Sequence, residues 1–576
     1  MRDGRRVLVL DADAGAALAI VQSLGRAGFH VALGATALGH RAFRSRYVAE
    51  TCVYPDPLAD KAAFQAWARG LAGFDLIIPP TERTLIPLGE IRDAPALAGR
   101  VALPPAAAVE VAFDKERVRA LAARLGIPTP ENVVVDAPAG LDHPTIDAWL
   151  AEGAVVLKSV RSKVWGDAGG GRELVVRMAC DRAQLHREAD PLLASGPVQL
   201  QRWLPGHGVG IEMLVDRGEP VLTFAHERIH ELPLTGGGSS YRRAIAPPAD
   251  LVEASTHLLA ALDWHGVAMV EFRRDPRTGA APLIELNGRF WGSLPLAVFA
   301  GCDFPLALAR LLLDGERPAP VRPRRVFARQ LGRDLDWLKA MTLVRVADLR
   351  RRGPPPPERR LVIGRPVVRS VVEWARLLSG RETWDGAALD DPGPIARELV
   401  EVAARQRDAA LVRARRTLAA RRAVRAWRRP LGRVERVLVL CSGNICRSAY
   451  AGVRLAEALA PRGIEVRSGG LVGPSGRPSP DGFAAAARAR GVDLGAHRSH
   501  HAGDDDLAWA DLVLIMDEGH QRRMAGKNGA RAKTRWLGAL GGGPAAIADP
   551  IDLDADGIEG VLDRLDDAIA RLVARL

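Results

Sequence analysis

Short apolar runs alternate with helical periodicity over the first 112 residues. Three runs begin at residues 5, 30 and 74 and read RRVLVL, HVALGA and FDLIIPP. Between them, apolar residues recur every three to four positions, as in AALAIVQSLGRAGF and TERTLIPLGEI. Strands that alternate with helices in this way favour a doubly wound parallel sheet. We therefore predict an α/β domain over residues 1–112, whose glycines lack the spacing of a dinucleotide site.

The pattern becomes mixed over residues 113–315. Turn residues separate pairs of apolar runs at VDRGEP (215–220) and at RRDPRTGAAP (273–282). Apolar runs joined by such short, turn-rich segments are typical of β-hairpins. The sequence therefore predicts an α+β domain here.

Proline and arginine dominate residues 316–433, which we predict to be a linker. Its least foldable part is RRGPPPPERR (351–360). A long helix is predicted over 394–429, opened by Pro394 and ended by Pro430 and Gly432. The apolar positions of this helix form only a loose stripe, as in a solvated spacer or a packing helix.

Length and composition place the chain among multidomain globular proteins. It has 576 residues, of which 48% are hydrophobic and 26% charged. No apolar stretch approaches the roughly 20 residues that span a bilayer, and the N-terminus lacks the apolar core of a signal peptide. Five scattered cysteines fit a reducing compartment. We therefore expect a cytoplasmic protein without a transmembrane segment.

The charge of the chain is strongly basic. The formal net charge is +12 and the pI is about 10.0. Arginine carries most of the excess, which is densest between about 320 and 436. This leaves open a contact between the arginine-rich linker and an anionic surface, either a membrane or nucleic acid.

The stretch VLVLCSGNICRSAY (437–450) carries the clearest chemistry. A buried strand that feeds a turn and then a helix brings backbone N–H groups together at a helix N-terminus, which favours phosphate and a thiolate alike. Arg447, six residues after Cys441, can present a planar guanidinium to phosphate oxygens. Ser448 can donate to the Cys441 thiolate. A buried structural cysteine is the commoner fate of a single cysteine, but it does not account for the whole set.

The residues between Cys441 and Arg447 fit a phosphate-binding loop. Gly443 relieves a tight turn, and Asn444 tolerates left-handed backbone and can brace the loop through its side chain. The predicted loop comprises Ser442, Gly443, Asn444, Ile445 and Cys446.

Residues 434–576 resemble the low-molecular-weight protein tyrosine phosphatases, whose signature reads CSGNICRS here. The resemblance continues, in family order, through VRSGGL (466–471), GVDLGAHRSHH (491–501), ADLVLIMDEGH (510–520) and ADPIDLD (548–554). It implies a Rossmann-like α/β domain with a central parallel sheet, and a phosphatase that needs no metal or other cofactor. It also implies that Cys441 attacks phosphorus, that Arg447 holds the phosphate, and that Asp549 is the proton donor.

One departure from the family leaves the substrate open. Members often carry aromatic residues after Asp-Pro, whereas this chain has Ile551 and Asp552. The expected substrate is a phosphotyrosine protein or another phosphomonoester. Arsenate reduction on the same fold is the weaker alternative, because no cysteine follows Cys446 to complete a thiol relay. Cys446 is close enough in sequence to protect Cys441 as a disulfide, although packing explains it equally well.

A second cluster of polar residues lies in the α+β region. Glu271 belongs to one apolar run and Glu285 and Asn287 to the next, and residues 285 and 287 project from the same face of their strand. Two carboxylates and an amide carbonyl form an oxygen-rich site suited to Mg²⁺ that also holds nucleotide phosphates. Lys115 and Lys158 lie upstream, and the glycine-rich loop SKVWGDAGGG (162–171) could cover phosphates.

These elements resemble the ATP-grasp superfamily over about 113–315, with the preceding α/β unit as its pre-ATP-grasp domain. The resemblance implies that ATP and Mg²⁺ are bound and that a carboxylate is activated as an acyl phosphate before a nucleophile captures it. The carboxylate and the nucleophile stay unknown. The implied roles fall into three groups: ATP binding by Lys115, Lys158 and the hinge residues Gln201, Trp203 and Leu204, metal binding by Glu271, Glu285 and Asn287, and stabilisation of the transferring charge by Arg228 and Arg289.

The leading hypothesis is therefore a bifunctional enzyme, an ATP-grasp ligase joined by a helical linker to a cysteine phosphatase. In the alternative, the ATP-grasp half binds nucleotide without ligating and regulates the phosphatase. In a third, attachment through the linker to nucleic acid or a membrane is the main function and catalysis is secondary.

Overall fold

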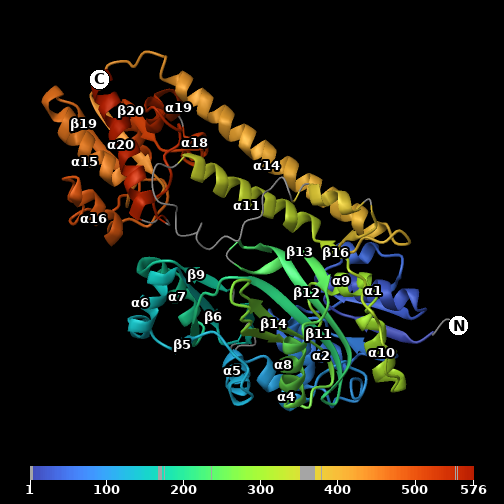
Figure 1. The fold of residues 1–576 in the computed structure, drawn as a ribbon. Helices are drawn as coiled ribbons and strands as arrows, with labels where there is room; N and C mark the ends of the chain where they lie inside the picture. The colour runs from blue at the N-terminus through green and yellow to red at the C-terminus, as the bar shows by residue number, and fades with distance from the viewer. Residues whose placement is uncertain are drawn as a thin grey trace. The chain divides into compact units, whose positions relative to one another are not determined.

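The computed structural model describes residues 4–161, 163–165, 171–173, 176–234, 236–350, 370, 372–377, 379–527, 529–551, 553 and 555–576. The chain divides into two compact units, Met1–Val402 and Ala403–Leu576, which we call the N-terminal unit and the C-terminal unit (Figure 1).

The N-terminal unit begins with the predicted parallel sheet. Its strands lie in the order β3 (Val48–Val53), β2 (His30–Ala35), β1 (Arg6–Val9) and β4 (Leu76–Ile78). The helices that follow these strands include α1 (Gly15–Arg26), α2 (Lys61–Arg69) and α3 (Glu82–Glu90). Strand β1 lies inside the sheet and buries its apolar run, which is why the pattern predicts it well. Strand β3 is a partly exposed edge with a polar sequence, which the apolar pattern does not mark.

A small antiparallel sheet follows, built from β5 (Asn132–Val135), β10 (Val198–Arg202), β6 (Val155–Ser159) and β9 (Arg177–Ala179) in that order. Its neighbouring helices are α5 (Lys115–Arg124), α6 (Pro144–Glu152) and α7 (Arg182–Leu193). The loop predicted to cover phosphates lies partly outside the described residues. Its described ends form the short antiparallel pair β7 (Lys163–Trp165) and β8 (Gly171–Glu173).

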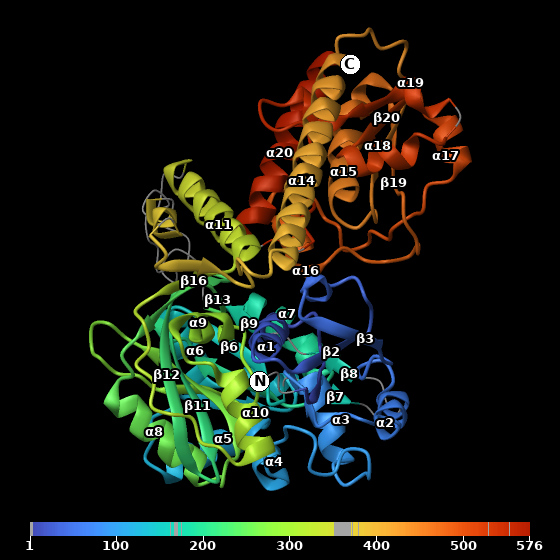
Figure 2. The same cartoon turned by 90° about the vertical axis from the view of Figure 1, so that its right-hand side faces the viewer.

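A seven-stranded sheet, the large sheet, forms the centre of the N-terminal unit (Figure 2). Its order is β15 (Leu283–Asn287), β14 (Gly266–Arg274), β11 (His207–Asp216), β12 (Glu219–Leu232), β13 (Gly238–Ile245), β16 (Phe327–Arg329) and β17 (Glu382–Trp384). Both predicted hairpins are present as the antiparallel pairs β11–β12 and β14–β15.

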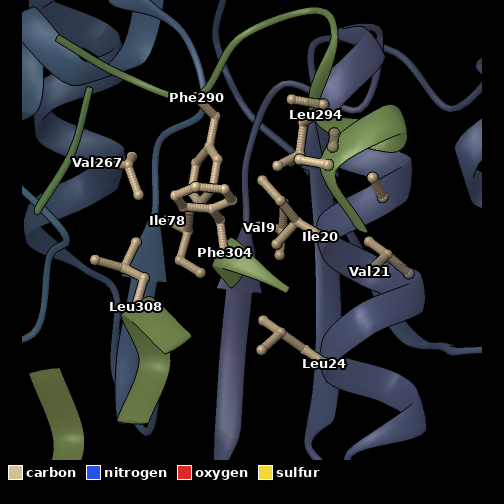
Figure 3. Packing of buried hydrophobic residues seen from close by; sticks show 14 of the residues in the cluster. Val9, Ile20, Val21, Leu24, Ile78, Val267, Phe290, Leu294, Phe304 and Leu308 are labelled. Carbon is tan, nitrogen blue, oxygen red and sulfur yellow. The ribbon is translucent and has the colours of Figure 1, made fainter. Parts of the chain in front are cut away.

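One face of the large sheet packs toward the N-terminal parallel sheet. Helices α9 (Leu294–Ala300) and α10 (Phe304–Asp314) lie between the two sheets and contact α1. Figure 3 shows the resulting core, in which Val9 and Ile78 from the parallel sheet share one cluster with Val267 and Phe290. The opposite face is covered by α8 (Ala249–Ala260) and α5. The first face therefore shares its core with the N-terminal parallel sheet.

Part of the segment predicted as a linker is folded into the large sheet. Strands β16 and β17 pair in parallel, and Arg329 of β16 is fully buried between Asp334 and Glu382, to which it donates hydrogen bonds. The intervening helix α11 (Leu331–Arg350) carries Asp334. Buried arginines with paired carboxylates are structural, so arginine here does not mark a solvated linker throughout.

The predicted long helix is present as α14 (Gly393–Ala426). Its central part is exposed, including Leu411 and Leu418, which are 47% and 48% exposed. Residues 403–429 hold ten arginines and one acidic residue, Asp408. Contact between this helix and an anionic surface stays a prediction.

The C-terminal unit is built on a four-stranded parallel sheet. Its strands lie in the order β19 (Glu465–Gly470), β18 (Arg436–Cys441), β20 (Leu512–Ile515) and β21 (Thr534–Trp536). The main helices are α15 (Arg447–Leu459), α16 (Asp481–Ala489), α18 (Glu518–Met524) and α20 (Ala555–Arg575). Since β18 lies inside the sheet, its carboxyl end opens between two neighbouring strands, the position at which α/β sheets bind ligands.

Within the described chain, no single helix is long and apolar enough to cross a membrane. The bent pair α9 and α10 passes the same test of length and composition only when both helices are taken together.

Candidate active sites

Cys441 ends β18 at the mouth of the loop formed by residues 442–446. The residue is 3% exposed. Its Sγ accepts hydrogen bonds from the Asn444 backbone N–H at 3.2 Å and from Ser448 Oγ at 3.0 Å. Helix α15 begins directly after the loop, so its N-terminal end adds positive potential at the same place. Two donors and a helix terminus therefore stabilise a thiolate at Cys441.

Asn444 braces the loop from inside. Its φ of +52° lies in the left-handed region that the sequence predicted it would tolerate. Its side-chain Nδ2 donates to Ser448 Oγ at 3.0 Å and to Ser468 Oγ at 3.1 Å, and its Oδ1 accepts from the backbone of His500. His497 Nε2 lies 2.7 Å from the Asn444 carbonyl oxygen. The loop is thus held by β19 and by the segment after α16, which the sequence reasoning did not assign.

Two glycines allow neighbouring groups to lie close to the backbone of the loop. Gly443 does not have a positive φ, so it does not relieve a strained turn as predicted. A Cβ on Gly443 would lie 2.8 Å from Arg477 Nη2, and the glycine makes room for that side chain. A Cβ on Gly470 would lie 3.0 Å from the Gly443 carbonyl carbon. The pair of glycines in VRSGGL was the sequence signal for this contact.

Arg447 faces two aspartates. Its side chain is 2% exposed, and its Nη1 donates to Asp517 at 3.0 Å and to the Ile547 carbonyl oxygen at 3.0 Å. Its Nη2 donates to Asp549, and its buried Nε has no hydrogen-bond partner among the residues that the structure describes. The structure therefore brings together Arg447 and Asp549, two of the predicted site residues. It adds Asp517, which lies in the MDEGH stretch and was not assigned a role.

His520 supports the first residue of the loop. Its Nε2 lies 3.0 Å from Ser442 Oγ, and its Nδ1 accepts a hydrogen bond from the Met516 backbone N–H at 3.3 Å. With Nδ1 as an acceptor, the neutral ring donates through Nε2 to Ser442. Burial lowers the pKa of His520 to about 4, against a smaller opposing effect of Asp517.

This depressed pKa makes the stability of the C-terminal unit pH-dependent. The unfolded chain takes up a proton at His520 near pH 6.5, whereas the folded chain does so only near pH 4. Stability is therefore lost as pH falls through this window, by up to roughly 3 kcal/mol. We expect the protection factors of β18 and β20 amides, which correct for the slower intrinsic exchange at low pH, to fall between pH 6.5 and 4, and His520→Gln to flatten this response. An equal response in the two proteins would show that His520 is not responsible.

Cys446 precedes α15 and is 3% exposed. Burial, with a smaller effect of Cys441, raises the pKa of its thiol to about 12. Cys446 is therefore a neutral thiol at physiological pH and does not compete with Cys441 as a nucleophile.

The predicted metal residues lie on one face of the large sheet. Glu271 of β14 and Glu285 of β15 are directly opposite one another, and Met269 is opposite Asn287. Directly opposite residues share a face, and so do residues two apart on one strand. Glu271, Glu285 and Asn287 are therefore adjacent. This is the face that packs toward the N-terminal parallel sheet.

Arg228 reaches this face from two strands away. It lies on β12, yet its Nη1 donates to Glu271 on β14 at 2.8 Å and its Nη2 donates to the other carboxylate oxygen. The intervening strand β11 carries Gly208 and Gly210. A Cβ on Gly208 would lie 2.7 Å from Arg228 Cδ, and one on Gly210 would lie 2.5 Å from the His226 ring. Gly208 therefore leaves space for Arg228 and Gly210 leaves space for His226, and the sequence reasoning missed both glycines.

Lys158 joins the site from the small sheet. It is 8% exposed, and its Nζ donates to Gln201 Oε1 at 2.9 Å. Burial lowers the pKa of Lys158, and the opposing pull of the Glu285 and Glu271 charges shows that these carboxylates are close. The charge of Lys115 lowers it further. A buried lysine with a weakened hold on its proton gains strongly from an arriving phosphate.

An open pocket of about 570 Å³, counted to its mouth, collects several of the predicted ATP-binding residues. Its polar lining includes Lys115, Gln201 and Glu285, and its apolar lining includes Val118 and Leu286. We call this space the nucleotide pocket.

Two hinge residues lie elsewhere. Trp203 and Leu204 are outside the lining of the nucleotide pocket. The Leu204 carbonyl oxygen accepts a hydrogen bond from Arg273 Nε at 2.8 Å, and the Trp203 backbone N–H donates to Ala154. Of the predicted hinge, the structure therefore places Gln201 alone in this pocket.

Arg289 follows β15 and contacts the N-terminal parallel domain. Its Nε lies 3.3 Å from Glu82 at the start of α3, and its Nη1 donates to the Phe290 carbonyl oxygen at 2.8 Å. Glu82 also lines the nucleotide pocket. The parallel domain therefore supplies a carboxylate to the site, which no sequence motif indicated.

The comparisons with known proteins agree with both sites. Residues 436–576 match the family model of the low molecular weight phosphotyrosine protein phosphatases, and residues 196–332 match the model named ATP-grasp in the biosynthetic pathway with Ter operon. A low molecular weight protein-tyrosine-phosphatase of Streptomyces coelicolor is 32% identical over 155 residues, covering 24% of this chain and 92% of that protein. A protein-arginine-phosphatase of Geobacillus stearothermophilus is 31% identical over 143 residues, covering 24% and 95%.

Solved structures show similarity to each region. The L-amino acid ligase from Bacillus licheniformis is 18% identical, with a TM-score of 0.43, over 56% of this chain and 78% of that chain. The tyrosine phosphatase AmsI of Erwinia amylovora is 29% identical, with a TM-score of 0.24, over 25% of this chain and 95% of that chain.

The loop at Cys441 and the relatives together define a cysteine-dependent phosphatase domain beside an ATP-grasp domain. Since curated relatives above 30% identity are covered over more than nine-tenths of their length, the chain belongs to the low molecular weight phosphotyrosine protein phosphatase family. The predicted fusion, an enzyme with an ATP-grasp ligase-like domain before the phosphatase domain, is confirmed. ATP binding follows from the ATP-grasp domain.

Proposed function

We propose that the C-terminal unit hydrolyses phosphotyrosine-type monoesters through a phosphocysteine at Cys441. The observation that carries this proposal is the convergence on one loop of a thiol with two hydrogen-bond donors, a buried arginine and Asp549. Phosphotyrosine is the preferred substrate because the relatives are protein-tyrosine phosphatases. Phosphoarginine is the second candidate, because one relative is a protein-arginine-phosphatase.

The first step is an in-line displacement. The Cys441 thiolate attacks phosphorus, the bond between phosphorus and the leaving oxygen breaks, and Asp549 gives its proton to that oxygen. The loop N–H groups and Arg447 hold the equatorial oxygens. Since Arg447 and Asp549 are paired in the free enzyme, phosphate must replace Asp549 at the guanidinium. Asp549 is then available to act as the acid toward the leaving oxygen.

The second step regenerates the enzyme. Asp549, now ionised, takes a proton from water, whose oxygen attacks phosphorus, and the bond between phosphorus and Cys441 Sγ breaks to release inorganic phosphate. Ser448 Oγ donates to the departing Sγ and stabilises the thiolate. Asp517 receives the Arg447 Nη1 bond throughout and fixes the position of the guanidinium.

Substitution of the acid should discriminate among leaving groups. In Asp549→Ala, we expect hydrolysis of a phenyl phosphate to fall by about 10²- to 10³-fold, whereas a nitrophenyl phosphate, whose leaving group needs little protonation, falls far less. Steady-state kinetics on a series of aryl phosphates, with phosphoarginine alongside, measure how the loss of activity depends on the leaving group. The exposed Asp505→Ala, on α17 (Asp504–Trp509), serves as the matched control. Equal losses for good and poor leaving groups would remove Asp549 from the role of acid.

We propose in addition that the N-terminal unit is an ATP- and Mg²⁺-dependent carboxylate ligase. A carboxylate oxygen of the substrate attacks the γ-phosphorus of ATP, ADP leaves, and a nucleophile then attacks the acyl carbon and expels phosphate. Lys115 and Lys158 hold phosphates, while Arg228 and Arg289 balance the charge of the transferring group. The proposal rests on three observations: Lys115 and Glu285 line the nucleotide pocket, the charges of Glu285 and Glu271 act on Lys158, and Arg228 pairs with Glu271.

The chemistry of Glu271, Glu285 and Asn287 fits Mg²⁺. The described residues contain no cluster of three or more His, Cys, Asp and Glu, but hard oxygen donors on one sheet face satisfy a cation that prefers carboxylate and amide oxygens. Bound there, Mg²⁺ neutralises phosphate charge during transfer. Arg228 keeps Glu271 charge-balanced in the free protein and must release it when the cation arrives.

The ligase proposal is tested by release of ADP. The full chain carrying Cys441→Ser, in which phosphatase chemistry is blocked, is incubated with ATP, Mg²⁺ and a panel of carboxylic acids. Acid-dependent ADP formation supports ligation. Nucleotide binding without turnover for any acid supports the alternative of a nucleotide-binding regulatory module. We propose a cytoplasmic location, which fits five cysteines that form no disulfide within the described residues.

A further inference from the structure

A second pocket lies beside the proposed ligase site, between the N-terminal parallel domain and the large sheet. It measures about 350 Å³, counted to its open mouth. Ile78 and Pro79 line it at the carboxyl end of β4, and Val267 and Phe290 line it from the large sheet. The carboxyl edge of a doubly wound sheet is where such folds bind ligands. The position of this pocket is therefore that of a substrate site.

The lining of this second pocket is mostly apolar, and His265 and Arg289 are its two polar side chains. Figure 3 shows Ile78, Val267, Phe290 and Leu308 directed toward a common space from β4, β14, the loop after β15 and α10. Each of these side chains is at most 7% exposed. The walls thus offer burial to an aliphatic or aromatic group, and the side chains that can form hydrogen bonds there are His265 and Arg289.

Arg289 is the cationic residue of the lining, and it separates this pocket from the nucleotide pocket. Arg289 lines the apolar pocket, its partner Glu82 lines the nucleotide pocket, and the two side chains meet at 3.3 Å. Nε and Nη1 of Arg289 are used by Glu82 and by the Phe290 carbonyl oxygen, while Nη2 has no hydrogen-bond partner within the described part of the chain. A carboxylate at Nη2 would lie at the boundary of the two pockets.

We propose that the apolar pocket receives the body of the carboxylic acid substrate, so that the ligase activates acids with an aliphatic or aromatic side chain. The carboxylate binds Arg289 and faces the nucleotide pocket, and the apolar group fills the space bounded by Ile78, Val267 and Leu308. This inference rests on the proposed ligase function. It adds the substrate class, which the motifs leave open.

The test compares acids of equal charge and different side chains in the full chain with Cys441→Ser. Hydroxylamine is the nucleophile, because its nitrogen attacks the acyl phosphate carbon, displaces phosphate and leaves a hydroxamate that can be measured together with ADP. We expect 4-methylpentanoate and phenylacetate to exceed glycolate and succinate in kcat/KM by about tenfold or more. ADP and hydroxamate should form in equal amounts.

Filling the pocket provides the structural control. Ala102 lines it and is partly buried, whereas Ala98 lies nearby on the exposed surface. Ala102→Phe should raise KM for the larger apolar acids about tenfold, with a smaller effect on propionate and none on KM for ATP. Ala98→Phe should leave KM unchanged for the larger apolar acids, for propionate and for ATP. Leu312→Ala, which enlarges the same pocket, should restore part of the loss in Ala102→Phe.

The outcomes separate the two proposals. Turnover with apolar acids, reduced in a size-graded manner by Ala102→Phe, supports the inference. Turnover confined to polar acids, or equal effects of Ala102→Phe and Ala98→Phe, overturns the inference and leaves the ligase intact. Absence of ADP with every acid, despite measurable ATP binding, overturns the ligase function and this inference with it.

Discussion

Cys441→Ser is expected to reduce the hydrolysis of an aryl phosphate by a factor on the order of 10⁴ or more. A serine hydroxyl at this position is a far weaker nucleophile than a thiolate, and the N–H of Asn444 and the hydroxyl of Ser448 cannot ionise it to the same degree. The serine also makes a poor leaving group, so any phosphoserine formed would hydrolyse slowly. Single-turnover kinetics with a nitrophenyl phosphate measure both steps.

The matched control is Cys180→Ser. Cys180 is a half-buried thiol in the N-terminal unit, and its removal should leave phosphatase turnover unchanged. Because Cys441→Ser preserves size and the hydrogen bonds at the loop, its thermal stability should stay close to that of the wild type. Turnover that survives Cys441→Ser would show that the thiol is not the nucleophile.

Glu285→Gln is expected to have the second large effect, a loss of acid-dependent ADP formation of about 10²- to 10³-fold. Glutamine keeps one oxygen donor and the shape of the side chain but removes the negative charge that a divalent cation needs. It also removes the larger of the two carboxylate effects that stabilise protonated Lys158, whose pKa burial already lowers. The Mg²⁺ concentration for half-maximal rate should rise in parallel.

Glu253→Gln, an exposed change on α8, provides the comparison for Glu285→Gln. Calorimetric titration with ATP supplies a readout that does not depend on turnover. There, the dependence of ATP affinity on Mg²⁺ should be weakened in Glu285→Gln and unchanged in Glu253→Gln. An unaltered Mg²⁺ dependence would place the metal elsewhere.

The sequence predicted those parts of the fold in which a local pattern decides the structure. The apolar runs at β1, β2, β4 and β18 are buried strands, and the turn-rich segments at 215–220 and 273–282 join the antiparallel pairs β11–β12 and β14–β15. The polar edge strand β3 was missed because its burial is slight. The β16–β17 pair was missed because its pairing joins residues more than 50 positions apart across a proline-rich segment.

The two candidate active sites show the same division between residues set by a local motif and residues set by distant contacts. Cys441, Arg447 and the loop between them are contiguous in sequence, and a contiguous motif fixes their geometry. Asp517, His520 and Glu82 act through contacts with distant residues, and no spacing rule connects them to the motifs. Gly208 and Gly210 were missed for a further reason, since they leave space for the side chains of Arg228 and His226, and an absent side chain has no pattern of its own.

The Asp549 carboxylate pairs with Arg447 and is therefore an internal competitor of phosphate for the guanidinium. A carboxylate tethered a few ångströms from the guanidinium acts at a high effective concentration, fixed by the loop that carries it rather than by the solution. A phosphate that binds Arg447 as proposed competes with this carboxylate for the guanidinium. Affinity for the substrate and retention of the product are therefore lowered together. The size of this effect is set by the length and stiffness of the loop that carries Asp549.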